Sequence, residues 1–382
     1  MSTTCNSSTA EVASPKPVQC AVDEIVHSYD EFKHHFTLGD LLLSGGQGAI
    51  YSTRYAQRGS SYNLITKRVS IRGQHSSEDA LIKTVQEFII QRGLNFMHYH
   101  GISFDGDKNS VLLTMEMLEY TLADAVDFHL DAHLHDFECY RSELGLKYFM
   151  LEVASFLAQL HGAGFVHLDI KPENVMFRND RNESTLFNGN GFKVIDLGLA
   201  EHIGHKRDCV DMDCYVGTLG YSAPEMNVFA SAQRKSHVTF KADIWSLAAT
   251  ILFVLNGYNL FDRVSKKSEK TDTRNKLEKY SEYVEKLENR DLINSHLLSL
   301  YLVNRISFHL YDLLSQMLEY NPKSRLSARE VLTHPLFADL VFQGKDGELY
   351  CSANQRRRAS KPREVVPLTQ SVQINMSVTS DD

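Results

Sequence analysis

The stretch from His167 to Met176 constrains the fold of this 382-residue chain more than any other segment. It places Asp169, Lys171 and Asn174 in close succession between apolar residues. Just before it, from Ser142 to His161, apolar side chains recur at helical spacing, and glycines follow as typical helix-end signals. The sequence therefore predicts a long amphipathic helix that leads directly into a loop carrying an acid, a cation and an amide.

Read in order, this loop resembles the catalytic loop H-R-D-x-K-P-E-N of the eukaryotic protein kinases. The resemblance implies that Asp169 accepts the proton of the substrate hydroxyl and that Lys171 neutralises charge on the transferred phosphoryl group. It also implies that Asn174 binds Mg²⁺ through its amide oxygen. Lys171 followed by Pro172 and Glu173 is typical of the serine/threonine kinases, and Glu173 hints at basic residues near the phosphosite.

A second oxygen ligand is needed for Mg²⁺, because this hard cation prefers oxygen donors. Lys193 to Gly198 resembles the strand and D-F-G motif of the same family, with Leu197 in place of Phe. Asp196, within it, is the second expected metal ligand. ATP and Mg²⁺ are the cofactors that the resemblance implies.

A glycine-rich segment follows an apolar strand near the start of the resemblance. Glycines lack Cβ and let a hairpin backbone lie close over phosphate groups. Against the kinase pattern G-x-G-x-x-G-x-V, Gly45 and Gly48 match, Ile50 takes the Val position and Leu43 replaces the first Gly. The resemblance implies that these residues and Leu42 cover the nucleotide; a plain hairpin turn is the alternative.

The next predicted strand, Asn63 to Ile71, carries Lys67 where the kinases have the lysine that grips the nucleotide phosphates. Alone, a lysine on an alternating strand is most simply an outward, solvated residue. The full set of motifs favours the phosphate-binding interpretation. Ile65 takes the place of the small Ala beneath the adenine, which predicts a tighter nucleotide pocket.

A helix is predicted from Ser77 to Gly93 by its apolar spacing. Glu87 is the expected partner of Lys67, because the residues around it resemble the αC helix of the kinases. Glu78 is the rival, but a carboxylate at a helix start favours the helix dipole and needs no other role. Gln91 stands where kinases usually place an apolar residue, which predicts a looser arrangement of this helix.

The apolar strand from Val111 to Met117 leads into a segment that resembles the hinge between the two kinase lobes. The resemblance implies that Met115 controls access behind the adenine and that the backbone from Glu116 to Leu118 hydrogen-bonds the base. It also implies that Met176 forms the floor beneath the adenine. A buried strand is the plain interpretation of this run, and it is compatible with these roles.

The segment after the D-F-G-like motif has an unusual composition for a regulated kinase. Leu168 stands where most regulated kinases have the Arg that binds an activation-loop phosphate. From Leu199 to Gly217 there is no Ser or Thr, and Tyr215 carries the only side-chain hydroxyl. We therefore predict activity without activation-loop phosphorylation. The acidic residues here supply standing negative charge or, more plainly, form a solvated loop: Asp208, Asp211 and Asp213.

Gly217 to Glu225 closely matches G-T-x-x-Y-x-A-P-E, the substrate platform of serine/threonine kinases. Thr218 is expected to hydrogen-bond near the catalytic Asp and Lys. Glu225 needs a buried cationic partner, because an unpaired internal carboxylate is costly, and Arg325 is where the family keeps that partner. Asp243, on an almost wholly apolar helix, is expected to anchor the backbone of the catalytic loop.

The resemblance covers roughly residues 36 to 338 and implies the α+β, bilobal protein kinase fold. We expect a small antiparallel-sheet N-lobe with the αC helix at about residues 36–117. A larger, mainly helical C-lobe is expected at about residues 121–338. Residues 1–35 are predicted to be a flexible leader and residues 339–382 a disordered tail.

A charged insert is predicted at about residues 258–306, a region longer than is usual for the family. Within it Leu277, Tyr280, Val284 and Leu287 have the spacing of an amphipathic helix. A solvated insert is the plain interpretation, and a docking surface for a protein partner is the sharper one. In the tail, the basic run Arg356 to Ser360 fits a phosphosite, a nuclear signal, an autoinhibitory element or a solvated patch.

Composition narrows the partners. The net charge of −8 argues against a general nucleic-acid binder and mildly favours basic substrates. Six cysteines without a C-x-x-C pair indicate neither a disulfide framework nor a zinc site, and we expect reduced intracellular thiols. Because no signal peptide or membrane-spanning run is present, a soluble protein of the cytoplasm or nucleus, without membrane contact, is predicted.

These features predict a serine/threonine protein kinase that transfers the γ-phosphoryl group of ATP to protein Ser or Thr hydroxyls, mainly by positioning and charge stabilisation. The alternative is a pseudokinase or scaffold that binds nucleotide or partners without efficient catalysis. Four departures favour it: Leu43, Ile65, Gln91 and Leu197. Four retained residues oppose it: Lys67, Asp169, Asn174 and Asp196. A kinase of small molecules or lipids is expected to lack the Thr218 to Glu225 platform.

Overall fold

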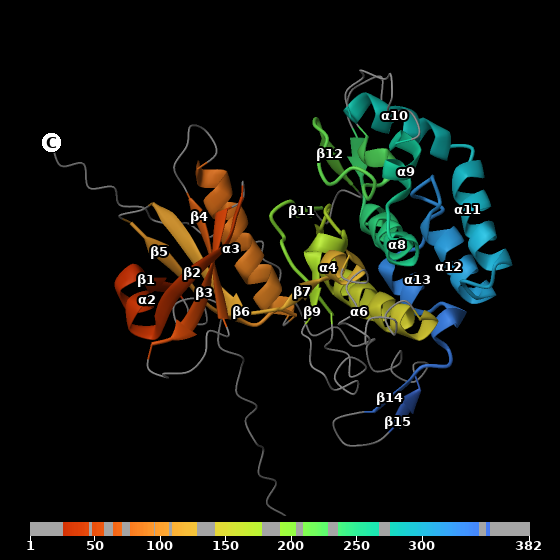
Figure 1. The fold of residues 1–382 in the computed structure, drawn as a ribbon. Coiled ribbons are helices and arrows are strands. Elements are labelled where there is room, and N and C mark those ends of the chain that lie inside the picture. The colour runs from red at the N-terminus through yellow and green to blue at the C-terminus, as the bar shows by residue number, and fades with distance from the viewer. Residues whose placement is uncertain are drawn as a thin grey trace, which may run out of the picture. The chain divides into compact units, whose positions relative to one another are not determined.

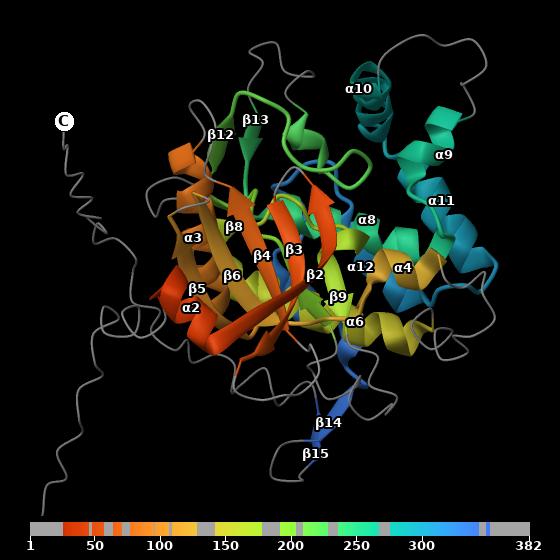
Figure 2. The same ribbon diagram turned by 60° about the vertical axis from the view of Figure 1, so that its left-hand side comes forward.

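The computed structural model describes residues 26–45, 48–56, 64–70, 77–94, 96–106, 109–127, 142–177, 192–203, 209–227, 236–266, 276–343 and 349–351 (Figures 1 and 2). The chain divides into two compact units. The first comprises Met1–Phe88 and His98–Met117, and the second comprises Ile89–Met97 and Leu118–Asp382.

The first unit is built on a six-stranded sheet in the order β1-β5-β6-β4-β3-β2 (Figure 2). Its elements are β1 (Val26–Ser28), α2 (Tyr29–His35), β2 (Phe36–Gly45), β3 (Gly48–Tyr55), β4 (Leu64–Ser70), β5 (Tyr99–Asp105), β6 (Ser110–Glu116) and the first part of α3 (Ser77–Leu94). Neighbouring strands are antiparallel, except that β1 runs parallel to β5 at the edge. The small antiparallel sheet that the sequence predicts is thus present, with one parallel strand added.

One face of this sheet carries a buried ladder of threonine hydroxyls. Side chains alternate between the two faces of a sheet, and Thr53, Thr66 and Thr114 share one face across β3, β4 and β6. Thr66 Oγ1 lies 2.8 Å from Thr53 Oγ1 and 3.0 Å from Thr114 Oγ1. The hydroxyls satisfy one another, so this polar row costs little when it is buried.

Residues 26–35 are ordered, although the sequence predicts a flexible leader as far as residue 35. Helix α2 begins with a capping box between Ser28 and Glu31 and buries Phe32 in a cluster with Leu64. Burial of this aromatic side chain offsets the conformational entropy lost when the segment folds. The leader prediction is therefore wrong for residues 26–35, and the rest of the predicted leader lies outside the described residues.

The second unit is mainly helical. Its helices are α4 (Leu122–Asp127), α6 (Glu143–Gly162), α8 (Lys241–Asn256), α9 (Leu260–Lys266), α10 (Lys276–Leu287), α11 (Asp291–Leu302), α12 (Phe308–Met317) and α13 (Ala328–Leu332), with short 3₁₀ turns η3 (Pro172–Asn174), η4 (Pro224–Met226) and η5 (Pro335–Phe337). The helix predicted from Ser142 to His161 is confirmed as α6, with Ser142 as its N-cap.

Small sheets connect these helices. They pair β10 (Phe192–Val194) with β9 (Val175–Phe177) and β7 (Tyr120–Thr121), β11 (Glu201–His202) with β8 (Phe165–Val166), β12 (Val210–Met212) with β13 (Ser236–Val238), and β14 (Val341–Gln343) with β15 (Leu349–Cys351). Asn174 directly precedes β9 and Asp196 closely follows β10, so the antiparallel pairing of these strands brings both residues to the same end of the strand pair.

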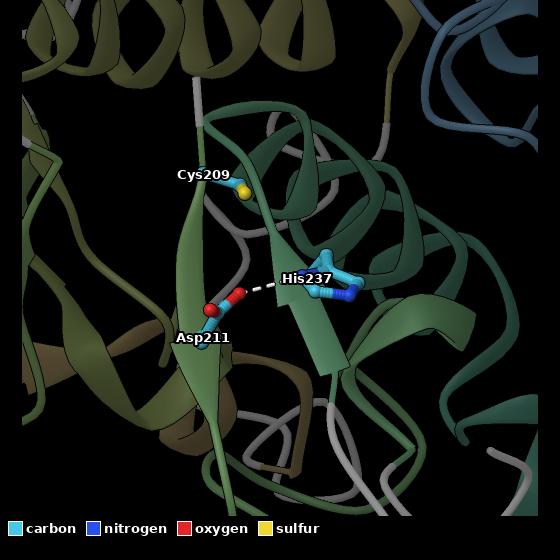
Figure 3. A group of neighbouring side chains, drawn as sticks. All are labelled: Cys209, Asp211 and His237. Atoms are coloured by element: carbon cyan, nitrogen blue, oxygen red, sulfur yellow. Dashed lines mark hydrogen bonds and ion pairs between the residues drawn. The ribbon is translucent and has the colours of Figure 1, made fainter. Parts of the chain in front are cut away.

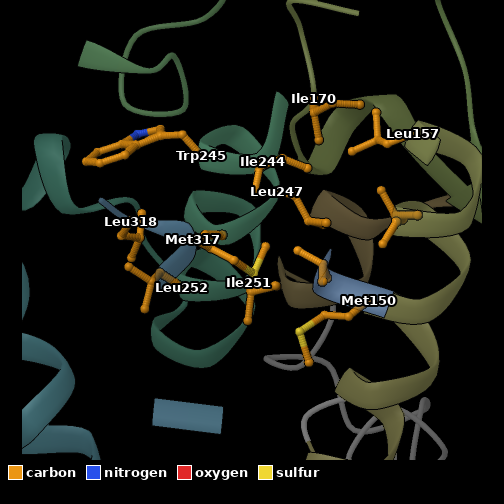
Figure 4. Packing of buried hydrophobic residues seen from close by; sticks show 14 of the residues in the cluster. Met150, Leu157, Ile170, Ile244, Trp245, Leu247, Ile251, Leu252, Met317 and Leu318 are labelled. Atoms are coloured by element: carbon orange, nitrogen blue, oxygen red, sulfur yellow. The ribbon is translucent and has the colours of Figure 1, made fainter. Parts of the chain in front are cut away.

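Helices α6 and α8 form the centre of the core of the second unit. Met150 and Leu157 of α6 and Leu247 and Ile251 of α8 belong to one buried cluster (Figure 4). Helix α8 is buried on nearly every side, as its almost wholly apolar sequence predicts, and ends at Gly257 with a φ of 79°. This core provides rigid support for the loop between β8 and β9.

The predicted insert at residues 258–306 is an integral part of this core. The amphipathic helix expected there is confirmed as α10, and its Tyr280, Val284 and Leu287 are almost completely buried. Helices α9 and α11 flank it and also contribute buried apolar residues. The interpretation as a merely solvated insert is therefore wrong for its described residues.

The prediction of a disordered tail from residue 339 is wrong for its described residues. Leu340 is buried, Asp339 pairs with Lys147 at 2.9 Å, and β14 and β15 form a hairpin. The basic run Arg356 to Ser360 lies outside the described residues. Within the part of the chain that the structure describes, none of the helices combines the length and apolar character needed to cross a membrane.

Candidate active site

The loop from His167 to Met176 is held by a single buried carboxylate on α8. Asp243 accepts hydrogen bonds from the backbone N–H groups of His167 at 2.8 Å and Leu168 at 2.9 Å, and from His161 Nε2 at 2.8 Å. Burial acts to raise the pKa of Asp243, but the hydrogen bonds from His161 and the His167 backbone bring it below its ordinary 3.8. The expected anchoring by Asp243 is confirmed, and His161 is a partner that the sequence did not indicate.

Three of the predicted site residues meet in a closed hydrogen-bonded triangle. Lys171 Nζ lies 2.8 Å from Asp169 Oδ2 and 2.9 Å from Thr218 Oγ1, and Thr218 Oγ1 donates to Asp169 Oδ1 at 2.7 Å. Asp169 is only 6% exposed. Both of its carboxylate oxygens thus have partners, and the carboxylate is held in one orientation.

The orientation of Asn174 suits a metal ligand. Its Nδ2 donates to the backbone oxygen of Asp169 at 2.8 Å and to Asp169 Oδ2 at 2.9 Å, so the amide nitrogen is assigned by two acceptors. The amide oxygen is left as the acceptor. Asp196 closely follows β10, which pairs with β9 immediately after Asn174, and Ile195 N donates to Asn174 O at 2.9 Å. An amide oxygen and a carboxylate carried by neighbouring strands fit Mg²⁺, which binds oxygen ligands.

Both turns of this site contain strained backbone. Leu168 has a φ of 68° and Asp196 a φ of 63°, in the left-handed region that costs non-glycine residues roughly 1–2 kcal/mol each. Leu168 is also 1% exposed and belongs to the apolar core. The side chain in the place of the usual Arg is therefore buried rather than available to a phosphate.

In the first unit, one face of the sheet gathers the predicted nucleotide-binding residues. The register places Ile50 opposite Lys67 and Ile65 opposite Met115, so all four side chains share a face. Lys67 Nζ lies 3.0 Å from Glu87 Oε2. Glu87 is 4% exposed and also accepts from the Tyr99 hydroxyl at 3.2 Å. The expected Lys67–Glu87 pair is observed; the side chain of its rival, Glu78, lies outside the described residues.

The β2–β3 hairpin requires glycine at one position. Gly48 has a φ of 134°, and a Cβ there would lie 2.3 Å from the carbonyl oxygen of Arg68 on β4. Leu42 and Leu43 on the paired strand are 49% and 64% exposed, and Gly45 pairs directly with Gly48. The tip between them lies outside the described residues. The hairpin thus presents apolar side chains and a close backbone approach.

The remaining predicted residues lie at the ends of short strands. Met115 is buried on β6, and Glu116 exchanges backbone and side-chain hydrogen bonds of 2.9 Å with His98. Leu118 is buried at the start of the next stretch of the second unit, and Met176 is half-buried on β9.

The segment from Gly217 to Glu225 is fixed by contacts that its sequence indicated. Arg325, 1% exposed, binds Glu225 through two hydrogen bonds of 2.7 and 3.0 Å. Gly217 has a φ of 96°, and a Cβ there would lie 2.7 Å from both the Leu168 carbonyl oxygen and Ser222 Oγ. The expected partner of Glu225 is confirmed, and this segment packs directly against the loop that carries Asp169.

Tyr215 is held by a contact with the same segment, Gly217 to Glu225. Its hydroxyl donates to Ser222 Oγ at 2.8 Å, and its ring packs edge-on against Tyr280 of α10. Burial raises the pKa of Tyr215 to about 12. The only hydroxyl side chain between Leu199 and Gly217 is therefore engaged in packing.

Residues 36–337 match the protein kinase domain family. The chain belongs to this family. Curated kinases are similar to it over large regions. Serine/threonine-protein kinase cds1 of Schizosaccharomyces pombe is 28% identical over 250 residues, covering 64% of this chain and 46% of the relative. Protein kinase gsk31 of the same yeast is 26% identical over 308 residues, covering 78% and 74%.

A human relative gives a similar picture. Mitogen-activated protein kinase 13 of Homo sapiens is 30% identical over 210 residues, which are 51% of this chain and 51% of the relative. This protein kinase family member thus spans about half the length of the first curated relatives it matches. The two-lobed α+β fold expected from the motifs is the fold of the family.

Proposed function

We propose that this protein is a serine/threonine protein kinase that transfers the γ-phosphoryl group of ATP to protein hydroxyls. The hydrogen-bonded triangle of Asp169, Lys171 and Thr218 carries the proposal. It brings a carboxylate and an ammonium group from one loop to a hydroxyl from the distant platform segment. Thr218 and Lys171 at these positions belong to the serine/threonine version of the kinase pattern.

In this proposal the residues act by positioning. Asp169 Oδ1 and Oδ2 are fixed by Thr218, Lys171 and Asn174, so a substrate hydroxyl meets a carboxylate of one orientation that accepts its proton. The Lys171 ammonium group offsets negative charge as the oxygen attacks phosphorus. Lys67, held by Glu87, is proposed to bind the nucleotide phosphates.

Mg²⁺ bound to Asn174 and Asp196 would neutralise the nucleotide phosphates. The residues of this chain prepare that site in two ways: Asp169 binds the Asn174 amide nitrogen, which leaves the amide oxygen as the acceptor, and the pairing of β9 with β10 brings the two ligand-bearing turns to the same end of the strand pair. Replacement of Asn174 with Asp removes the N–H donor that binds Asp169 and places a second carboxylate beside it. We expect this variant to need a higher Mg²⁺ concentration for half-maximal transfer.

We also propose that the kinase is active without phosphorylation of the segment from Leu199 to Gly217. Leu168 is buried in the core, and the Tyr215 hydroxyl is bonded to Ser222, which together support this proposal. Phosphatase treatment of the purified protein is expected to leave activity unchanged. Loss of activity, with the removed phosphate mapped to this segment, would refute it.

Protein substrates are proposed to dock on an apolar surface of the predicted insert. At the end of α11, Leu298, Leu302 and Val303 are 45%, 67% and 63% exposed. Phe308, 58% exposed, begins α12 beside them and contacts the ring of Tyr301. Clustered exposed apolar side chains of this kind are typical of protein-binding surfaces.

The proposal is tested by incubating the protein with Mg-ATP and a degenerate library of peptides containing Ser, Thr or Tyr. We expect transfer to Ser and Thr, and its loss in Asp169→Asn. A pseudokinase or scaffold would bind nucleotide but give no transfer above that of the variant. Transfer to Tyr alone would refute the proposed substrate class.

A further inference from the structure

Three side chains of different chemistry meet on the segment between Asp196 and Glu225 and on the strand paired with it. The Cys209 Sγ, a carboxylate oxygen of Asp211 and a ring nitrogen of His237 all lie within 4.8 Å of one another (Figure 3). His237 Nδ1 is 2.5 Å from Asp211 Oδ1. None of the three takes part in the triangle around Asp169.

The strand register brings these residues together. β12 and β13 are antiparallel, with Asp211 directly opposite His237, and directly opposed residues share a face of the sheet. Cys209 directly precedes β12, and its Sγ lies within 4.8 Å of the ligand atoms of Asp211 and His237. The alternate residues, Met212 and Val238, are buried on the other side. This pair of short strands thus buries one face, and the three donors gather on the outer one.

We propose that Cys209, Asp211 and His237 form a binding site for Zn²⁺. A thiolate, an imidazole and a carboxylate are the ligands that this ion prefers, whereas Mg²⁺ and Ca²⁺ select oxygen donors. Donors around a tetrahedral zinc ion lie roughly 3–4 Å apart, so small rotations of the exposed Asp211 and His237 side chains complete the set. A water molecule takes the fourth position.

Such an ion would clamp this segment in place. The site joins β12, within the segment from Asp196 to Glu225, to β13, directly before α8. Resting on the proposed kinase function, zinc then performs the ordering task that a phosphate performs in many regulated kinases, because the stretch from Leu199 to Gly217 lacks Ser and Thr. The affinity for zinc must decrease as the pH is lowered, because protons compete with the metal for the thiolate and the imidazole.

The site is tested on the full-length protein after removal of metal with a chelator. Zn²⁺ is titrated against a chromophoric competitor, and Co²⁺ is substituted to detect thiolate-to-metal charge-transfer absorption. We expect the zinc stoichiometry of wild type to exceed that of Cys209→Ser and that of His237→Ala by one Zn²⁺ per chain. Cys214→Ser, which removes the exposed neighbouring cysteine outside the cluster, is the matched control and should bind like wild type.

Two outcomes would overturn the site: equal zinc stoichiometry in wild type and Cys209→Ser, or a Co²⁺ thiolate band that survives Cys209→Ser and disappears in Cys214→Ser. Zinc is also expected to raise the melting temperature of wild type and Cys214→Ser only.

Phosphotransfer is measured separately, so the two proposals fail in different ways. Zinc binding without any transfer refutes the kinase proposal and leaves the metal site standing. Transfer by a protein that binds no zinc refutes the site alone. Transfer that is identical with and without bound zinc refutes its ordering role.

Discussion

Gln91 of α3 donates a hydrogen bond from Nε2 to the backbone carbonyl oxygen of Val194 at 3.1 Å. Both residues are fully buried, and Val194 ends the strand that leads to Asp196. The sequence predicted that a polar residue here would loosen the helix. The structure instead shows a specific bond between the C-terminal end of α3 and β10, within the second unit. Gln91 Oε1 is buried without a hydrogen-bond partner, so the desolvation of this oxygen offsets part of the stability that the bond from Nε2 provides.

Substitutions of Gln91 test how much its hydrogen bond to the Val194 carbonyl contributes to stability. Gln91→Met keeps the shape and leaves the Val194 carbonyl unpaired, so we expect a loss of about 1 kcal/mol in the free energy of unfolding. Gln91→Glu places a carboxylate against that carbonyl and should cost about 3 kcal/mol or more. Urea denaturation measures both. As a control, Gln159→Met on exposed α6 surface should change little; equal losses at the two positions would contradict the assignment.

Gly217 is expected to be intolerant of any side chain. Gly217→Ala must accommodate a positive φ and a Cβ 2.7 Å from the Leu168 carbonyl oxygen, which we expect to cost about 3 kcal/mol of unfolding free energy. Gly93→Ala, in α3 with open space around it, is the control and should be neutral or stabilise by up to about 1 kcal/mol. A Gly217→Ala protein as stable as wild type would show that the platform and the Asp169 loop are not in close contact.

Asp243 makes stability depend on acid pH. Its pKa lies below 3.8 in the folded protein, so its ionised form contributes stability above the unfolded-state value, and this contribution is lost as pH falls through the lower folded value. Asp243→Asn should cost about 3 kcal/mol near neutral pH, because it removes a charged acceptor of three hydrogen bonds. The difference between wild type and variant should shrink as pH falls below 3.8. Urea denaturation across this range measures it, and a difference independent of pH would be contrary evidence.

Disruption of the apolar surface at the end of α11 should lower the phosphorylation of protein substrates and leave that of short peptides unchanged. Replacement of Leu302 and Val303 with Ser is expected to lower kcat/KM for a protein substrate about tenfold, the loss of one moderate contact site. Short peptides should be phosphorylated as before. Leu144→Ser, which changes an exposed leucine on α6, is the control. An equal loss with both substrates would instead indicate damage to the catalytic unit.

Much of the site could be predicted because its residues lie within short, ordered motifs. Asp169, Lys171 and Asn174 belong to one loop, and its resemblance to the catalytic loop of the kinases implied their roles. Helices α6 and α10 were predictable because each has a regular apolar face. The pair of Glu225 and Arg325 was predictable because a buried carboxylate requires a cation and the resemblance to the kinases implied which cation it is.

Other features depend on tertiary contacts that no local pattern reveals. Phe32 orders a segment with little periodicity, because its side chain is buried in an apolar cluster with Leu64 and Leu112 of the sheet. The neighbour of Gln91 is a backbone carbonyl, which carries no sequence signal. Cys209 and His237 are joined only by the register of two short strands, and the absence of a C-x-x-C pair concealed them.

In the proposed mechanism, Asp169 accepts the proton of a Ser or Thr hydroxyl during phosphoryl transfer. The most direct measurement compares γ-phosphate transfer from Mg-ATP by wild type and by Asp169→Asn, after both are shown to have the same unfolding free energy and nucleotide affinity. We predict that kcat falls by at least about 100-fold in Asp169→Asn with little change in nucleotide affinity. Transfer by Asp169→Asn at the rate of wild type would contradict the account.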